Sequence, residues 1–319
     1  MKPLSIVLSF LLTCSTMTDQ KSARPTDALS QQAYAEIHDV LAKQSEFVKV
    51  HAAEYLIWLG EKDEAKKVFL REEELHHTVP KYRVVVWRVL AQTETEPKAK
   101  KKWTDQVFQS FADPDGPDRI HAAETLGKLK LSPMAAYAAA TNQILTTEKE
   151  NLYVYTLWAS SHASPEAYEK NKTKFLNFIY HSENEDLRRI SAFVLRREGK
   201  LNQKEWDELA LRAIVEASSP MGQTLLNTAF ATATDNQANT KKLGEIRSAM
   251  LANPEKLKAA ERIELALVLA DHGDQRDLPL LKGMLENQHS NGIYEVNSAV
   301  AADVRATAAY AILKINKRK

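Results

Sequence analysis

Apolar residues recur three and four positions apart along most of this chain. Two examples are Val48, Ala52, Leu56 and Leu59, and Ile120, Ala123, Leu126 and Leu129. In an α-helix this spacing places the apolar side chains on one face, which can then be buried. Only 9 glycines and 11 prolines leave little room for an architecture of strands and turns. The pattern predicts an all-α protein.

The helical pattern repeats. The motif His-Ala-Ala-Glu-x-Leu occurs at residues 51–56 and again, 70 residues later, at 121–126. A looser pattern, a basic residue followed four positions later by alanine, extends the series. Including weaker copies, eight units start at residues 49, 83, 119, 151, 188, 222, 262 and 305. Repeats of a few tens of residues are typical of solenoids, which mostly bind other molecules.

Each unit is predicted to be a helical hairpin. Gly60, Gly127 and Gly199 are expected to end the first helices, because a left-handed residue after a helix is easiest for glycine. The alanines would let adjacent helices approach closely. Second helices are predicted at residues 63–75, 133–145, 203–217 and 276–285.

The clearest units are residues 113–127 and 303–313, where an acidic residue precedes an Arg, an alanine pair and a leucine. They resemble HEAT repeats of the short bacterial kind, also seen in phycobilisome-lyase-like proteins. The resemblance covers nearly all of residues 31–319 and implies a right-handed α-α superhelix, a HEAT-like solenoid of about eight hairpins. Tetratricopeptide repeats have a closer period, but their Trp, Leu-Gly, Tyr and Ala-x3-Phe positions do not recur here.

The N-terminus predicts export. Lys2 and the apolar run that follows indicate a signal peptide over residues 1–13. Leu11-Leu12-Thr13-Cys14 resembles a bacterial lipoprotein signal, which implies acylation of Cys14, although Thr13 is larger than the residue usual there. The alternative is a plain secretory signal in which Cys14 has no role. Polar residues 14–30 then predict a flexible tether, and residues 31–319 the folded solenoid.

A lipid anchor would place the protein in the bacterial cell envelope, at the outer membrane or facing the periplasm. Beyond residue 13 no apolar run approaches the length that spans a bilayer. With 43 basic and 42 acidic residues, the net charge is +1. No global basic field is present, so nucleic acid is not expected as a partner.

Histidines are the natural candidates for chemistry. The pairs His51–Glu54 and His121–Glu124 could relay protons, but their equivalent placement in two repeats favours a structural role. Glu72 has the helical spacing of a metal ligand relative to His76, but no third ligand is evident. The chain has no phosphate-binding loop, nucleophile elbow or cysteine nucleophile. No catalytic, cofactor-binding or metal residue is therefore predicted.

Other recurrent features have structural interpretations. The Arg of each unit is expected to pair with an acid of the preceding turn, as Asp118 with Arg119 or Asp303 with Arg305. Residues 286–302 are expected to form a polar loop. The tryptophans are predicted core residues, and any on the concave face would be interaction anchors. They are Trp58, Trp87, Trp103, Trp158 and Trp206.

The predicted function is a non-catalytic, membrane-anchored scaffold that binds a protein partner. A loose resemblance to segments attached to bacterial sulfatases implies a polysaccharide-processing partner, although the sulfatase nucleophile motif is absent here. The alternatives are an enzyme on an α-toroid, using His and Glu on the inner face, and a structural envelope protein. A deep pocket gathering His and Glu from non-adjacent repeats would favour the enzyme, and an open, shallow groove the scaffold.

Overall fold

The computed structural model describes residues 27–148, 150–199, 201–234, 240–287, 295 and 298–318. Cys14 and the expected signal peptide lie outside these residues, as do residues 288–294, 296 and 297 of the expected loop at 286–302. The loop prediction is wrong for residues 299–302, which form the first turn of a helix. The regular structure in the described ranges is entirely helical, which confirms the all-α prediction. Among these helices none is long and apolar enough to cross a membrane.

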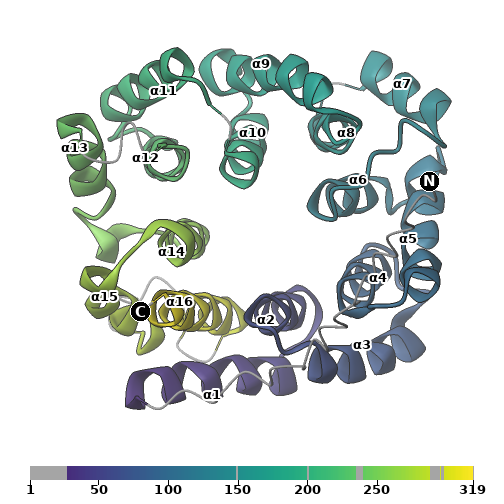
Figure 1. Ribbon diagram of the computed structural model, residues 1–319, viewed down its shortest axis with the longest axis horizontal. Helices are drawn as coiled ribbons and strands as arrows, with labels where there is room; N and C mark the ends of the chain where they lie inside the picture. Colours follow the sequence, from purple (N-terminus) through teal and green to yellow (C-terminus); the bar gives the residue numbers. More distant parts are fainter. Residues whose placement is uncertain are drawn as a thin grey trace, which may run out of the picture.

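The α-helices form two concentric rings (Figure 1). The inner ring consists of α2 (Glu46–Leu59), α4 (Tyr82–Thr93), α6 (Arg119–Lys128), α8 (Asn151–Ser161), α10 (Glu185–Glu198), α12 (Gly222–Ala231), α14 (Ala259–His272) and α16 (Ala299–Lys317). The outer ring consists of α1 (Ala28–Lys43), α3 (Lys62–His76), α5 (Pro97–Ala112), α7 (Ala138–Thr147), α9 (Pro165–His181), α11 (Gln203–Val215), α13 (Lys241–Met250) and α15 (Leu278–Leu285). Short 3-10 turns, Pro254–Lys256 and Gln275–Asp277, precede α14 and α15.

The inner helices correspond to the eight repeat starts found in the sequence, so the predicted array of helical hairpins is confirmed. The pairing within a hairpin differs from the prediction, because each outer helix comes before its inner helix. Helix α1 is therefore the outer member of the first hairpin, and residues 28–30, assigned above to the tether, belong to it. Asp27 caps this helix by accepting a hydrogen bond from the backbone N–H of Ser30.

The array closes on itself. The last helix, α16, packs against both α1 and α2 as well as against α14 and α15 (Figure 1). Polar contacts join the two ends of the chain along this seam: the Tyr55 hydroxyl lies 2.7 Å from that of Thr307, and Arg305 donates to Glu36 at 2.7 Å. The repeats thus form a closed ring.

Helix α16 can close the ring because much of it is alanine. Ala302, Ala306 and Ala309 are each fully buried, as are several of their neighbours. Buried residues cover most of the surface of α16 between Ala301 and Ile315, because this stretch packs between other helices. Single-methyl side chains let the neighbouring helices approach the α16 backbone closely.

The three glycines expected to end helices divide into two groups. Gly60 and Gly199 follow α2 and α10 in the left-handed conformation, with φ of 102° and 64°, as predicted. The prediction for Gly127 is wrong, because this residue lies inside α6. A Cβ on Gly127 would come within 2.4 Å of the Trp158 ring. Gly127 therefore allows α8 to pack closely on α6.

The predicted pairs of Arg119 with Asp118 and of Arg305 with Asp303 are not the ones formed: Arg305 pairs with Glu36 of another helix, and Arg119 bonds to backbone carbonyls. Asp118 accepts from Arg83 of the previous inner helix, with Nε 2.7 Å away, while Arg119 donates to the Phe111 carbonyl. Similarly, Arg188 contacts Glu216 at 2.7 Å. These pairs link successive hairpins, so the expected register role is met by different partners from those predicted.

Candidate functional site

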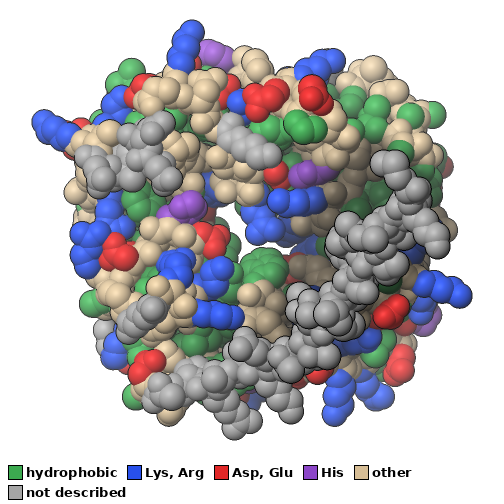
Figure 2. Space-filling view, in the orientation of Figure 1, with side chains coloured by type: hydrophobic (Ala, Val, Ile, Leu, Met, Phe, Trp, Pro, Cys, Tyr) green, Lys and Arg blue, Asp and Glu red, His purple; other side chains and the backbone are tan. Residues whose placement is uncertain are grey.

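The closed ring encloses a central cavity of about 610 Å³. Each inner helix of the ring contributes at least one lining residue. In Figure 2 the centre of the ring is hollow, and Lys and Arg side chains gather at its edge. The volume lies within the range of small-molecule binding sites. The cavity is the strongest candidate for a functional site in the described part of the chain.

All inner helices run in the same direction, because the outer helix of each hairpin returns the chain to the same end. Their last turns therefore surround one end of the cavity. Three cations, Lys128 of α6, Arg197 of α10 and Lys314 of α16, lie in these last turns and line the cavity. We call this region the basic end. Cations are favourable there because the helix dipoles present their negative ends.

Arg197 reaches across the cavity at the basic end. Its guanidinium carbon lies 5.5 Å from the centre of the Trp58 ring, which belongs to the non-adjacent helix α2. Lys128 is paired with Glu124 at 2.7 Å, and Lys314 lies 3.6 Å from Asp271. Among the described residues Arg197 has no carboxylate partner. It is therefore the cation most available to a ligand.

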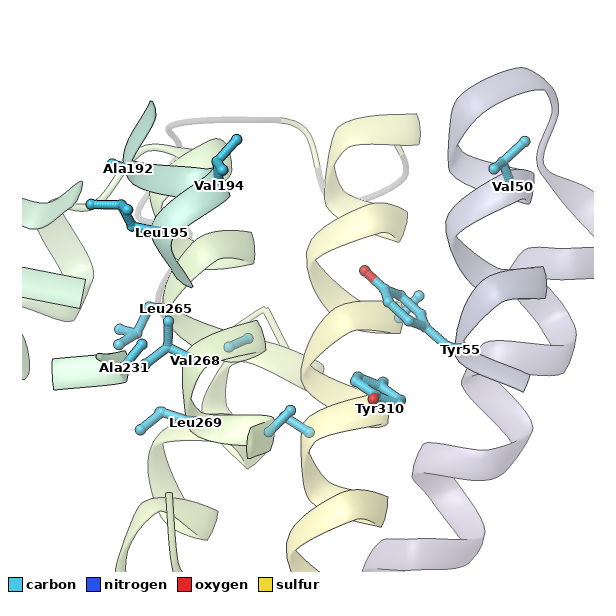
Figure 3. Close-up of a cluster of buried hydrophobic side chains, with 14 of the residues drawn as sticks. Val50, Tyr55, Ala192, Val194, Leu195, Ala231, Leu265, Val268, Leu269 and Tyr310 are labelled. Atoms are coloured by element: carbon cyan, nitrogen blue, oxygen red, sulfur yellow. The ribbon is translucent and has the colours of Figure 1, made fainter. Parts of the chain in front are cut away.

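Aromatic rings form one wall of the cavity. Tyr55 of α2 and Tyr310 of α16 are stacked across the seam, with ring centres 4.8 Å apart (Figure 3). Trp58 packs edge-on against Tyr310 at 5.6 Å, and its indole N–H donates to Gln92. Burial raises the pKa of both tyrosines, so their hydroxyls remain neutral. This wall is rigid, mostly apolar and uncharged.

The facing wall is supplied by α10 and α14. The aliphatic and aromatic side chains that line it are half-buried, except for Val268, which is buried. They are Ile190, Phe193, Ile263, Leu267 and Val268. Phe193 is held edge-on against the buried Trp158 ring, with centres 5.6 Å apart. The cavity thus combines an apolar middle with a cationic end.

The acidic residues of the cavity are already engaged. Five basic and three acidic side chains line it. Of the acids, Glu54 accepts from Arg88 at 2.8 Å and from Gln92 at 2.9 Å. Burial alone would raise the pKa of Glu54, but Arg88 and other nearby cations lower it to about 2. Glu264 is held in the same way, 2.9 Å from Arg196. The free charge of the cavity is consequently positive.

The opposite part of the cavity contains a histidine–carboxylate pair. His51 of α2 lies with Nδ1 2.9 Å from Oδ1 of Asp303 on α16. The imidazole is one-third exposed and lines the cavity, whereas Asp303 is buried. A carboxylate at Nδ1 fixes the ring orientation and the tautomer. The contact joins residues from opposite ends of the sequence, so no local motif could have indicated it.

The other predicted candidates lie elsewhere. His121, the second copy of the histidine, does not line the cavity and lies 3.7 Å from Glu124. Glu72 on the outer helix α3 is engaged by Lys49 and Tyr82, each at 2.7 Å. In the described ranges no group of three or more His, Cys, Asp or Glu side chains is arranged to hold a metal ion.

The five tryptophans occupy two kinds of position, the protein core and the cavity lining. Trp87, Trp103, Trp158 and Trp206 are buried in the protein core, as expected. Trp58 is half-buried and lines the cavity on the concave face of the ring. It is therefore the tryptophan expected to act as an interaction anchor. Three residues of the site were not predicted from the sequence: Arg197, Tyr310 and Asp303. The first two line the cavity from inner helices, and the register of Arg197, nine residues after Arg188, is the signal that could have identified it.

Comparisons with known proteins find no match, so the function is inferred from the geometry of the cavity. No family model, no curated protein and no solved structure matches this chain. The class that the fold and the cavity define is a closed ring of helical hairpins with an amphipathic central cavity.

Proposed function

We propose that the protein binds a small amphipathic molecule in its central cavity. An anionic group of the ligand would lie at the basic end, and its apolar body against the aromatic and aliphatic walls. The observation that carries this proposal is the convergence of Lys128, Arg197 and Lys314 at one end of a cavity with an apolar middle. A cleft of one sign of charge with low-dielectric walls attracts the opposite charge strongly.

The proposal is one of binding and includes no reaction. The cavity does gather His51, Glu54 and Glu264 from non-adjacent repeats, which is the arrangement that would favour an enzyme over a scaffold. However, a general acid or base must be able to exchange a proton with the substrate. Glu54 is held by the buried Arg88 and Glu264 by the half-buried Arg196, and the pKa of Glu54 is far below neutral pH.

Isothermal titration calorimetry with two matched amphiphiles tests the proposal. Decanoate and decyltrimethylammonium have the same chain and opposite charge, and both are used below their micelle concentrations. We expect decanoate to bind and the cation to bind much more weakly. Arg197→Gln should weaken decanoate binding by about tenfold or more, because a charge-assisted hydrogen bond contributes roughly 1.5–3 kcal/mol.

The matched control is Arg276→Gln. Arg276 is exposed and pairs with Asp274 away from the cavity, so this variant removes the same charge without touching the proposed site. Decanoate should bind to it as to the unmodified protein. Equal affinity for the two amphiphiles, or unchanged decanoate binding by Arg197→Gln, would refute the proposal.

A role as an interaction scaffold is a second proposal, supported by the outer face rather than the cavity. Three apolar side chains of α11 are exposed to solvent: Leu211, Ile214 and Val215, the last 74% exposed. Exposed apolar clusters often mark protein contacts. Capture from crosslinked cell envelopes with the unmodified protein and with Leu211→Asp tests this role; equal recovery of partners would remove its support.

Envelope attachment is proposed from the sequence alone. Cys14 lies outside the described residues, so its acylation and the location that follows from it rest on the signal-like segment before it. The test is membrane fractionation of the unmodified protein and of Cys14→Ser. A protein that stays in the membrane fraction after this change would not be anchored through Cys14.

A further inference from the structure

We propose that His51 is a second polar contact for the ligand, and that the ligand carries a neutral hydroxyl about 10 Å from its anionic group. This inference rests on the binding function proposed above and names the class of ligand. The ligand would be a medium-length carboxylate, or a related anion, with a hydroxyl at its far end. Its support comes from the position of His51, its bond to Asp303 and the walls between the two polar ends.

The distance follows from helix geometry. His51 and Trp58 are seven residues apart on α2, which is close to two full turns, so both side chains project from the same face. At 1.5 Å per residue the separation along the helix is about 10 Å. Trp58 marks the basic end, because the Arg197 guanidinium lies over its ring. His51 is thus placed beyond the apolar middle of the cavity.

The bond to Asp303 sets what His51 can recognise. Nδ1 faces the two carboxylate oxygens at 2.9 and 3.1 Å, so in the neutral imidazole the proton belongs on Nδ1. Nε2 is then a hydrogen-bond acceptor, and no group in the described ranges is bonded to it. An acceptor on the cavity wall selects a donor such as an alcohol O–H.

The charges near His51 disfavour a second anion there. Asp303 is in direct contact with the imidazole. Glu54 lies one helical turn along α2, but its charge is balanced by Arg88. Another carboxylate would therefore be repelled by Asp303, whereas a hydroxyl carries no net charge and can donate to Nε2. The two ends of the cavity therefore select different groups.

The region between the two ends specifies an apolar spacer. Tyr55 and Tyr310 on one side, and Phe193 and Leu267 on the other, offer rings and methyl groups to the ligand. A polar group placed against these rings and methyl groups would lose hydration that they cannot replace. A saturated or aromatic spacer between the charged group and the hydroxyl fits this region.

The test compares hydroxylated acids with their unsubstituted parents. Hexanoate, octanoate and decanoate are titrated alongside 6-hydroxyhexanoate, 8-hydroxyoctanoate and 10-hydroxydecanoate. We expect the terminal hydroxyl to improve affinity at one chain length and to weaken it at the others. At the favoured length the gain should be about 2–10-fold, the usual contribution of one hydrogen bond.

Two variants locate the effect. His51→Leu should make the affinities for the hydroxylated and the unsubstituted acid of the favoured length equal. His121→Leu, which removes the histidine of the other copy, should retain the difference between them; thermal unfolding checks that each variant is folded. A hydroxyl gain that persists in His51→Leu, or no gain at any length, overturns the inference but not the binding function. If none of the acids binds, both proposals fail together.

Discussion

The two copies of His-Ala-Ala-Glu occupy equivalent positions on α2 and α6, yet their surroundings differ. Both glutamates interact with Arg88: Glu54 is bonded to it, and Lys128, His121 and Arg88 together hold the pKa of Glu124 below its ordinary value. The histidines diverge. His51 faces the cavity and Asp303, while His121 lies beside its own Glu124 and outside the cavity lining.

The difference has a simple physical origin. Helix α2 adjoins the seam of the ring, so its inner face meets a helix from the other end of the chain. Helix α6 has neighbours from the same part of the sequence. Identical side chains are thus given different partners by ring closure. The same motif therefore lines the cavity in one copy and lies outside its lining in the other.

The largest difference is expected when the two glutamates are neutralised. Glu54→Gln would leave Arg88, which is 2% exposed, without its bonded carboxylate, at a cost of about 3–5 kcal/mol in the free energy of unfolding. Glu124→Gln should cost less, because its main partner, Lys128, is partly exposed. Urea unfolding measures both variants. A larger loss in Glu124→Gln would contradict this ordering.

The pKa values of both glutamates lie below their ordinary value, so acid should weaken the contribution of each to stability. The folded pKa of Glu54, about 2, is below its ordinary value of 4.5, so its contribution to stability is complete above pH 4.5. That contribution is lost as the pH falls from 4.5 towards 2. Urea unfolding across this range should show a steeper loss for the unmodified protein than for Glu54→Gln. Parallel pH profiles would mean that Glu54 is not held by Arg88.

The next largest effects are expected at Gly60 and Gly127, the glycines that follow the two motifs. Gly127→Ala should cost about 1–3 kcal/mol, because the added methyl would overlap the ring of the buried Trp158. Gly60→Ala meets no neighbouring atom, and its cost, about 1–2 kcal/mol, comes only from the left-handed backbone. Combining Gly127→Ala with Trp158→Phe should be less than additive, whereas Gly60→Ala with Trp158→Phe should be additive. Thermal unfolding of the three single and two double variants checks this.

The smallest expected effect is at the seam itself. Asp303→Asn keeps the shape of the side chain but weakens its bond to His51, and should destabilise the ring by about 1 kcal/mol. Hydrogen exchange should increase in α1, α2 and α16 and remain unchanged around His121. Increased exchange spread evenly over the ring would show that the seam is not a separate weak point.

Much of this fold follows from local pattern. The three- and four-residue spacing of apolar side chains indicates the helices, and the recurring basic residue marks the start of each inner helix. The same register also contains part of the site. Trp58, Lys128, Arg197 and Lys314 each lie nine residues after the recurring basic residue of their repeat, so their common level in the ring could have been predicted.

Closure of the ring could not be predicted in this way. It depends on small rotations between successive hairpins, which accumulate over the whole array and leave no local signature. The partnership of His51 with Asp303 depends on closure and spans 252 residues of sequence. The placement of Gly127 failed for a related reason, because its partner Trp158 belongs to the next repeat. Long-range packing decided the points that local pattern left open.

The seam also indicates that the folded region could begin and end at other positions in the ring. Asn316 near the end of α16 donates to Ser30 near the start of α1 at 2.8 Å, so the two ends of the folded region are neighbours. A short linker could join them, and new termini could be opened in an exposed link elsewhere in the ring. In such a circular permutant the present seam would become a covalent connection, and the contacts at the new opening would be non-covalent. In this sense the ring has no intrinsic first repeat, and the present seam is one of several positions at which it could be opened.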